Sequence, residues 1–247
     1  TRGYGGTYNS SKPILIKKHF SSKIYSDEAI LLANELENIP VVSCHKRENS
    51  ISYIDNNFNI DVIISDDGLQ YNALIGDTKI IVIDGMRGFG NKNYIPFGPL
   101  RNSISSLKKA DQIIINNQKE EFLYQSIAKY NKNILLTKPI IKYVREIFGS
   151  NDFKIFNLNK AREDILKYKT IHVMTAIGNP KKFFDTVLSF LRIGDDKSQI
   201  KFNSLPDHFV FTEEHFLDKK ITSIYIMTSK DAVKLKSIKF RKTIRCF

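Results

Sequence analysis

Short runs of β-branched residues recur along the first half of the chain and predict β-strands. These runs occupy residues 14–17, 40–43, 62–65, 79–84, 112–116 and 133–137. Several are unbroken apolar stretches, which are typical of strands covered on both faces. Between them, residues 26–38 and 119–131 have acidic residues in their first turn and carry apolar residues at helical spacing, so they predict helices. Strands that alternate with helices predict an α/β fold with a mostly parallel sheet.

The alternation loosens around residues 138–165 and then restarts at residues 170–191. There a predicted strand leads into a helix with Asn179 as its cap and Pro180 in its first turn. The apolar stripe of this helix consists of Phe183, Phe184, Val187, Leu188 and Leu191.

Residues 223–236 repeat the order of strand, turn and helix. Together with the unit before it, this segment predicts a second, smaller α/β domain. We place the domains at residues 1–145 and 146–247.

The chain has 247 residues, with 42% hydrophobic and 26% charged residues and a formal net charge of +12. A basic chain suits an acidic small substrate, an anionic membrane face or nucleic acid. The lysines are scattered and no RNA- or DNA-binding motif is present, which disfavours nucleic acid. Two cysteines without a CxxC pair fit a reducing compartment. No apolar run approaches the roughly 18 residues that cross a bilayer.

Two adjacent carboxylates, Asp66 and Asp67, end the apolar run at 62–65. A buried carboxylate must be paired, hydrogen-bonded or bound to a metal. An apolar strand that ends in Asp matches the Walker B pattern, in which the carboxylate helps to hold Mg²⁺ on a nucleotide. A capping role at a strand-to-loop junction is the alternative.

Two further segments are rich in glycine. Residues 1–6, TRGYGG, combine glycines with Arg2 and Tyr4, and freed backbone amides can approach a phosphate or sugar closely. Residues 84–107 form a long loop with Arg87 and Arg101, which suggests a phosphate clamp. A plain turn and a mobile surface loop are the alternatives.

The order of these pieces is more specific than any one of them. The chain carries RGYGG, DEA, ISDDGLQ, RGFGN followed by GPLR, AIGNP, LPDHF and KDAVK in succession. In this order, from Thr1 to about Lys234, the sequence resembles the tetraacyldisaccharide 4'-kinases, the lipid A 4'-kinase family.

This resemblance implies a P-loop NTPase-like first domain with a smaller α/β domain after it. It also implies transfer of the ATP γ-phosphate, with Mg²⁺, to the 4'-hydroxyl of a tetraacyldisaccharide 1-phosphate. The product would be lipid IVA, made at the cytoplasmic face of the bacterial inner membrane. The implied partners are the lipid A precursor and the membrane surface, without nucleic acid.

Carried over by motif, Asp27 matches the proposed general base and His208 the histidine that supports it. Asp66 and Asp67 match the metal-holding pair. The remaining matches are to positions around the substrate and the phosphates, and they are Arg2, Tyr4, Glu28, Arg47, Gln70 and Arg101.

The sequence also departs from the family pattern. No G-x-x-x-x-G-K-[ST] phosphate loop occurs in these residues, and we expect it upstream of Thr1. Ser26 replaces Gly, Tyr71 replaces His, and Asn102 and Ser229 replace Glu. Two other readings stay open: a catalytically degenerate P-loop-type binding protein, and a nucleotide-sugar or nucleic-acid binding protein that does not use Asp27 and His208.

Overall fold

In the computed structural model the chain folds into two compact units. One unit combines residues 1–67 with residues 141–247, and the other consists of residues 68–140. The structure describes residues 1–8, 10–71, 76–117, 121–148, 152–194, 197–207, 209–216, 223–235 and 244–246.

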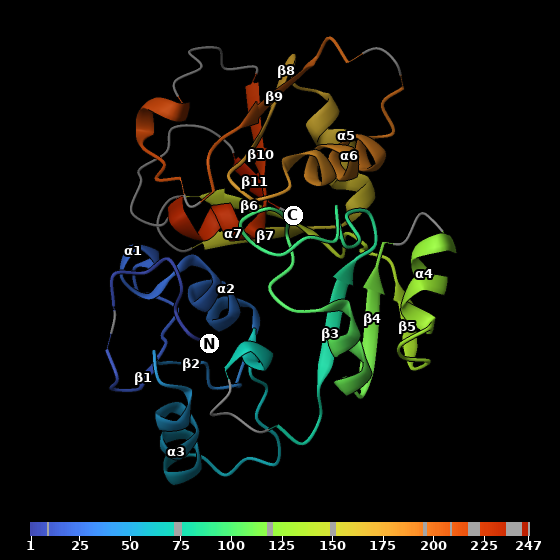
Figure 1. Ribbon diagram of the computed structural model, residues 1–247. Helices are drawn as coiled ribbons and strands as arrows, with labels where there is room; N and C mark the ends of the chain where they lie inside the picture. Colours follow the sequence, from blue (N-terminus) through green and yellow to red (C-terminus); the bar gives the residue numbers. More distant parts are fainter. Residues whose placement is uncertain are drawn as a thin grey trace. The chain divides into compact units, whose positions relative to one another are not determined.

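A six-stranded sheet forms the centre of the first unit (Figure 1). In pairing order its strands are β7 (Asp152–Phe156), β6 (Val144–Phe148), β11 (Ile244–Cys246), β10 (Ser223–Met227), β8 (Thr170–Thr175) and β9 (Ile200–Ser204). Strands β11, β10, β8 and β9 run parallel, whereas β6 and β7 pair antiparallel at one edge. The sheet is therefore mostly parallel, as the sequence predicts.

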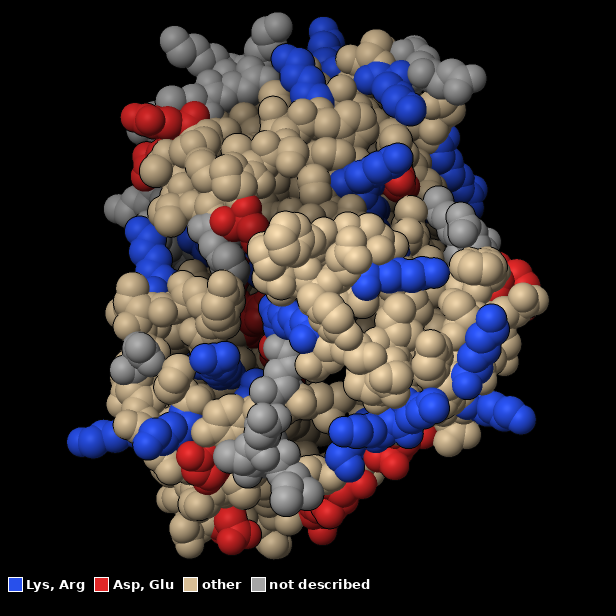
Figure 2. Space-filling view, in the orientation of Figure 1, with Lys and Arg blue, Asp and Glu red and all other residues tan. Residues whose placement is uncertain are grey.

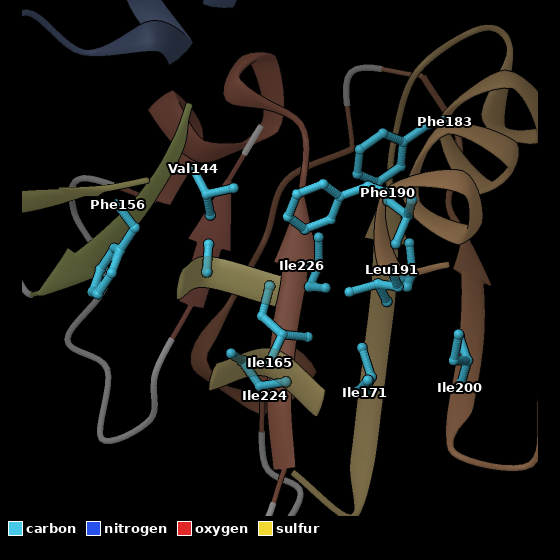
Figure 3. Close-up of a cluster of buried hydrophobic side chains, with 13 residues drawn as sticks. Val144, Phe156, Ile165, Ile171, Phe183, Phe190, Leu191, Ile200, Ile224 and Ile226 are labelled. Carbon is cyan, nitrogen blue, oxygen red and sulfur yellow. The ribbon is translucent and has the colours of Figure 1, made fainter. Parts of the chain in front are cut away.

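Helices α5 (Leu158–Leu166) and α6 (Pro180–Leu191) pack on one face of this sheet. The predicted start of α6 is confirmed, because the side chain of Asn179 accepts a hydrogen bond from the Lys182 amide at 3.3 Å. The apolar side chains of both helices meet those of the strands in one buried cluster (Figure 3). Its labelled members are Val144, Phe156, Ile165, Ile171, Phe183, Phe190, Leu191, Ile200, Ile224 and Ile226.

The opposite face of the sheet is covered as well. Alternate residues of the central strands, such as Met174 and Tyr225, pack in a second cluster with Phe211 and Phe216. Every residue of β10 is consequently buried, which explains its mostly apolar sequence.

The amino-terminal part of this unit contains short elements around α2. They are β1 (Ile14–Leu15), α1 (Ser22–Tyr25), α2 (Asp27–Glu35), β2 (Val42–Ser43) and α3 (Arg47–Asn57). The apolar face of α2 buries Ala29, Ile30 and Ala33, and Val233 from the carboxyl-terminal part of the unit joins this cluster. Val233 belongs to a 3₁₀ helix, Val233–Leu235, that follows α7 (Ser229–Ala232).

The described residues of the second unit form a three-stranded parallel sheet and an α-helix. Its strands are β3 (Ile80–Asp84), β4 (Gln112–Asn116) and β5 (Ile134–Thr137), in the order β3-β4-β5, and its helix is α4 (Glu121–Ala128). Its core combines β3 and β4 residues with Leu107, Leu123 and Ile127. The other 3₁₀ helices of the described chain are Gly68–Gln70, Ile104–Lys109 and Glu213–Phe216.

The strand prediction at residues 62–65 is wrong. The described chain has no strand there, and Val62 and Ile64 are 75% and 89% exposed. An apolar run becomes a strand only when another strand pairs with its backbone groups, and the described residues provide no such ladder here. Local sequence cannot report that partner.

The compact units do not follow the domain division predicted at residue 145. Glu35 of α2 accepts hydrogen bonds from both terminal nitrogens of Arg145, at 2.6 and 2.8 Å, and from the Tyr143 hydroxyl. These contacts join the amino-terminal part of the chain to β6 across more than 100 residues. The boundary between functional domains stays a prediction.

The start of α2 depends on two backbone constraints. Ser26, its cap, has φ 74° and ψ 149°, a region of the Ramachandran map that glycine alone occupies readily. Its side chain nevertheless accepts a hydrogen bond from the Ala29 amide at 3.2 Å. Gly6 packs against this turn, and a Cβ on Gly6 would lie 2.5 Å from the Ile24 carbonyl oxygen and 2.6 Å from the Ser26 nitrogen.

We expect Ser26→Gly to raise the free energy of unfolding by about 1 kcal/mol, because relief of the positive φ outweighs a lost cap worth a few tenths. Ser26→Ala keeps the strain and loses the cap, so it should lower stability by about 1 kcal/mol. Urea unfolding monitored by circular dichroism measures both changes. The control is Asn157, a cap with φ −60°, where substitution by Gly should not stabilise. A less stable Ser26→Gly variant would contradict this account.

Candidate active site

The first residue of α2 faces the segment that follows β10. Asp27 is buried, with 4% of its side chain exposed, and its Oδ2 lies 3.5 Å from Lys234 Nζ and 4.0 Å from Lys230 Nζ. Its Oδ1 accepts a hydrogen bond from the Glu28 amide at 3.0 Å. A buried carboxylate requires such compensation, and α2 docks where the two lysines supply it.

Lys234 is held by a fully buried aspartate. Its ammonium donates a hydrogen bond to Asp231 Oδ1 at 3.0 Å. Asp231 Oδ2 accepts hydrogen bonds from the Thr175 hydroxyl, the Ala176 amide and the Thr228 hydroxyl, at 2.9, 3.1 and 2.8 Å. Thr175 ends β8 and Thr228 follows β10, so the cluster lies at the carboxyl ends of these parallel strands. Ligand sites of open α/β sheets lie at such ends.

Lys230 lies at the more exposed side of the same cluster. Its ammonium is 3.2 Å from Glu28 Oε1 and 3.9 Å from Asp207 Oδ1, and 22% of its side chain is exposed. Burial by itself would lower the pKa of Lys230, but Asp27, Glu28 and Asp207 outweigh it and raise the pKa above its ordinary value. Lys230 is therefore a cation at neutral pH, and the stabilisation linked to its protonation is lost as the pH rises through that raised pKa.

Asp207 and Asp27, which belong to the same unit, both lie within 4.0 Å of the Lys230 ammonium. His208, the predicted support for Asp27, lies outside the described residues. The pairing of His208 with Asp27 therefore stays a prediction.

Asp66 and Asp67 are exposed in a turn after residues 62–65. Arg47, the buried first residue of α3, donates to the Ser65 hydroxyl at 2.7 Å and to the Asp67 carbonyl oxygen at 3.0 Å. Asp67 has a positive φ of 49°. Arg47 thus shapes the turn that presents the two carboxylates, a role that its motif match did not indicate.

The glycine-rich start of the chain places its two predicted substrate residues outward. Arg2 and Tyr4 are exposed, and Tyr4 is 73% exposed. Gly3 has φ 73° and a Cβ there would lie 2.7 Å from the Ser43 hydroxyl, so the loop lies close against β2. The loop therefore presents its side chains from a backbone conformation that favours glycine at residue 3.

The two remaining predicted substrate residues belong to residues 68–140. Gln70 ends a 3₁₀ helix, and its side chain lies outside what the structure describes. Arg101 is exposed in the long loop predicted at 84–107. This loop is ordered by its own hydrogen bonds, such as that from the Asn91 side chain to the Phe97 carbonyl oxygen at 2.8 Å.

Sequence reasoning did not assign roles to Lys230, Asp231 and Lys234. They lie in the segment KDAVK, whose spacing places two lysines four residues apart with an acidic residue beside one of them. That spacing indicates one helical face, but the partners Asp27 and Glu28 lie about 200 residues away in the chain.

The described residues contain no group of three His, Cys, Asp or Glu side chains that could hold a metal ion. Mg²⁺, however, usually binds one or two carboxylates together with waters and substrate phosphates. The exposed carboxylates of Asp66 and Asp67 therefore fit Mg²⁺ that arrives with a nucleotide. On the face shown in Figure 2, Lys and Arg side chains are dispersed among uncharged and acidic residues.

Comparison with known proteins identifies the relatives of this chain. A family model described as tetraacyldisaccharide-1-P 4'-kinase matches residues 1–247. The tetraacyldisaccharide 4'-kinase of Psychromonas ingrahamii is 32% identical over 235 residues, which cover 95% of this chain and 64% of that protein. The enzyme of the same name from Francisella tularensis subsp. novicida is 32% identical over 244 residues, with 96% and 70% covered.

A crystal structure of LpxK from Aquifex aeolicus, described as an "apo" form in complex with ATP, has the same fold. The TM-score is 0.67 at 21% identity, and the match covers 99% of this chain and 70% of that one. The chain thus spans roughly two thirds of the length of these relatives. The match over the whole sequence shows that this chain belongs to the tetraacyldisaccharide-1-P 4'-kinase family.

Proposed function

We propose that this chain serves an ATP-dependent kinase that phosphorylates the 4'-hydroxyl of a tetraacyldisaccharide 1-phosphate and so forms lipid IVA. The substrate class follows from the names of its family and relatives. The observation that carries the proposal for these residues is the buried carboxylate of Asp27 at the carboxyl ends of β8 and β10.

Asp27 is the proposed general base. The proton of the acceptor hydroxyl passes to its carboxylate, the hydroxyl oxygen forms a bond to the γ-phosphorus, and the bond from that phosphorus to the β,γ-bridging oxygen breaks to release ADP. His208, which follows Asp207 directly in the sequence, is proposed to support Asp27. Phosphoryl transfer depends mainly on alignment and charge neutralisation, and a fixed carboxylate supplies alignment at the acceptor.

Asp66 and Asp67 are proposed to hold Mg²⁺ on the nucleotide, where the ion neutralises phosphate charge. Arg47 supports this role because it fixes the turn that carries both carboxylates. We also propose that this turn and Asp27 converge on the same bound substrates.

The disaccharide and the phosphates are proposed to contact side chains from several segments. The exposed side chains of Arg2, Tyr4 and Arg101 can reach a ligand without rearrangement of a core. Glu28 is nearly half-exposed and pairs with Lys230, which supports its proposed contact with a ligand near Asp27. Arg47 and Gln70 complete the proposed set.

We propose that the reaction takes place at the cytoplasmic face of the bacterial inner membrane, where an acylated acceptor resides. Among the described helices, none is long and apolar enough to cross a bilayer. The net charge of +12 suits an anionic lipid acceptor and an anionic membrane surface, and nucleic acid is not among the proposed partners.

Asp27→Asn tests the base. The substitution keeps size and removes the basic oxygen, so we expect kcat to fall by roughly 10²–10⁴-fold while the KM for ATP changes little. Steady-state kinetics on the whole gene product that contains residues 1–247 measure both constants. Asp55→Asn, an exposed aspartate of α3, is the matched control and should behave as the unmodified protein. Near-normal turnover of Asp27→Asn would show that Asp27 is not the base.

Asp66→Asn tests the metal site and should give a different signature. We expect weaker apparent affinity for Mg²⁺, so that part of the lost activity returns as Mg²⁺ is raised. A magnesium titration of turnover compares this variant with Asp27→Asn, whose defect should not respond to the metal. If the Asp66→Asn defect is the same at every Mg²⁺ concentration, Asp66 does not help to bind the metal.

A further inference from the structure

We propose that Lys234 is a positioning residue that acts through Asp27, and that Asp231 anchors it. The inference rests on the proposed function, because it assigns Lys234 a role in holding the base. Lys234 is 9% exposed and lies between two buried carboxylates, 3.0 Å from Asp231 Oδ1 and 3.5 Å from Asp27 Oδ2.

The anchor is rigid because the carboxylate of Asp231 is satisfied on both oxygens. Oδ2 takes three donors from the ends of β8 and β10, and Oδ1 takes the Lys234 ammonium. The Asp231 amide in turn donates to the Thr228 hydroxyl at 3.1 Å. The position of the Lys234 charge is therefore set by the strands of the sheet.

The backbone position of Lys234 is fixed by the buried side chains of the residues before and after it. Its neighbour Val233 is buried in the cluster that contains Ala29 and Ile30 of α2. Its other neighbour, Leu235, is 1% exposed in the cluster on the six-stranded sheet. The 3₁₀ helix Val233–Leu235 thus ties α2 to the sheet through apolar contacts, and Lys234 adds an ion pair with the carboxylate of Asp27.

Lys230 has a different environment from Lys234. It is more exposed and is shared among Glu28, Asp27 and Asp207, of which Asp27 is the most distant at 4.0 Å. Lys234 is less exposed and pairs with the buried carboxylates of Asp231 and Asp27, at 3.0 and 3.5 Å. The geometry therefore favours Lys234 as the residue that fixes the orientation of Asp27.

The test is Lys234→Met, which keeps an unbranched stem and removes the cation. A carboxylate displaced by about 1 Å can cost on the order of 10²-fold in rate. We expect kcat of the whole gene product to fall by about that factor, with the KM values for ATP and for the disaccharide within about threefold. Lys167→Met is the matched control, because Lys167 also pairs with an aspartate three residues earlier, at 2.9 Å, but is 73% exposed.

A double-mutant cycle separates positioning from a merely structural role. If Lys234 acts through Asp27, Lys234→Met should have almost no further effect on kcat in the Asp27→Asn background. An equal loss in both backgrounds would contradict the inference, as would a normal kcat in Lys234→Met. If Asp27→Asn itself keeps normal turnover, the proposed base fails instead, which distinguishes the two failures.

Lys234→Arg keeps the test decisive if Lys234→Met does not fold. Arg preserves the buried charge but presents a planar fork in place of a compact ammonium. We expect circular dichroism to show that Lys234→Arg is folded. Its kcat should be about three- to tenfold lower, with nearly unchanged KM values. A folded Lys234→Arg variant with unchanged kcat would overturn the positioning role.

Discussion

The Lys234 ammonium between the carboxylates of Asp27 and Asp231 is the interaction on which the candidate site depends. It joins the first turn of α2 to the carboxyl ends of β8 and β10, across about 200 residues of sequence. Removal of one member of a buried ion pair typically costs 3–5 kcal/mol, because the other charge is left without compensation. The ion pair with Lys234 therefore compensates the buried charge of Asp27 and also fixes the position of its carboxylate. The proposed chemistry needs an ionised carboxylate that is held in place.

Local sequence patterns predicted the elements whose signals are local. The residues of β4 match the predicted run at 112–116, and α6 begins where Asn179 and Pro180 indicate. The apolar run at 62–65 has the same local pattern but forms no strand in the described chain, because strand formation depends on a partner elsewhere. The α/β class and the mostly parallel sheet were predictable, whereas the association of residues 1–67 with residues 141–247 was not.

The site was predictable only in part, for similar reasons. Asp27 was identified through the order of motifs, since nothing in its immediate sequence distinguishes it from an ordinary acidic first turn. Lys230 and Lys234 were missed because their carboxylate partners lie in α2, far away in sequence. The amino-acid composition also does not reveal the positive φ of Ser26. This backbone angle sets the direction of the chain at the start of α2, directly before the proposed base.

The most direct test of the central claim is a crystal structure of the whole gene product with the disaccharide acceptor and a non-hydrolysable ATP analogue. The account predicts that the acceptor 4'-hydroxyl oxygen lies within hydrogen-bond distance of Asp27, about 2.6–3.2 Å, while Lys234 still contacts Asp27 and Asp231. An acceptor hydroxyl bound to a different side chain, with Asp27 paired only to its lysines, would contradict it.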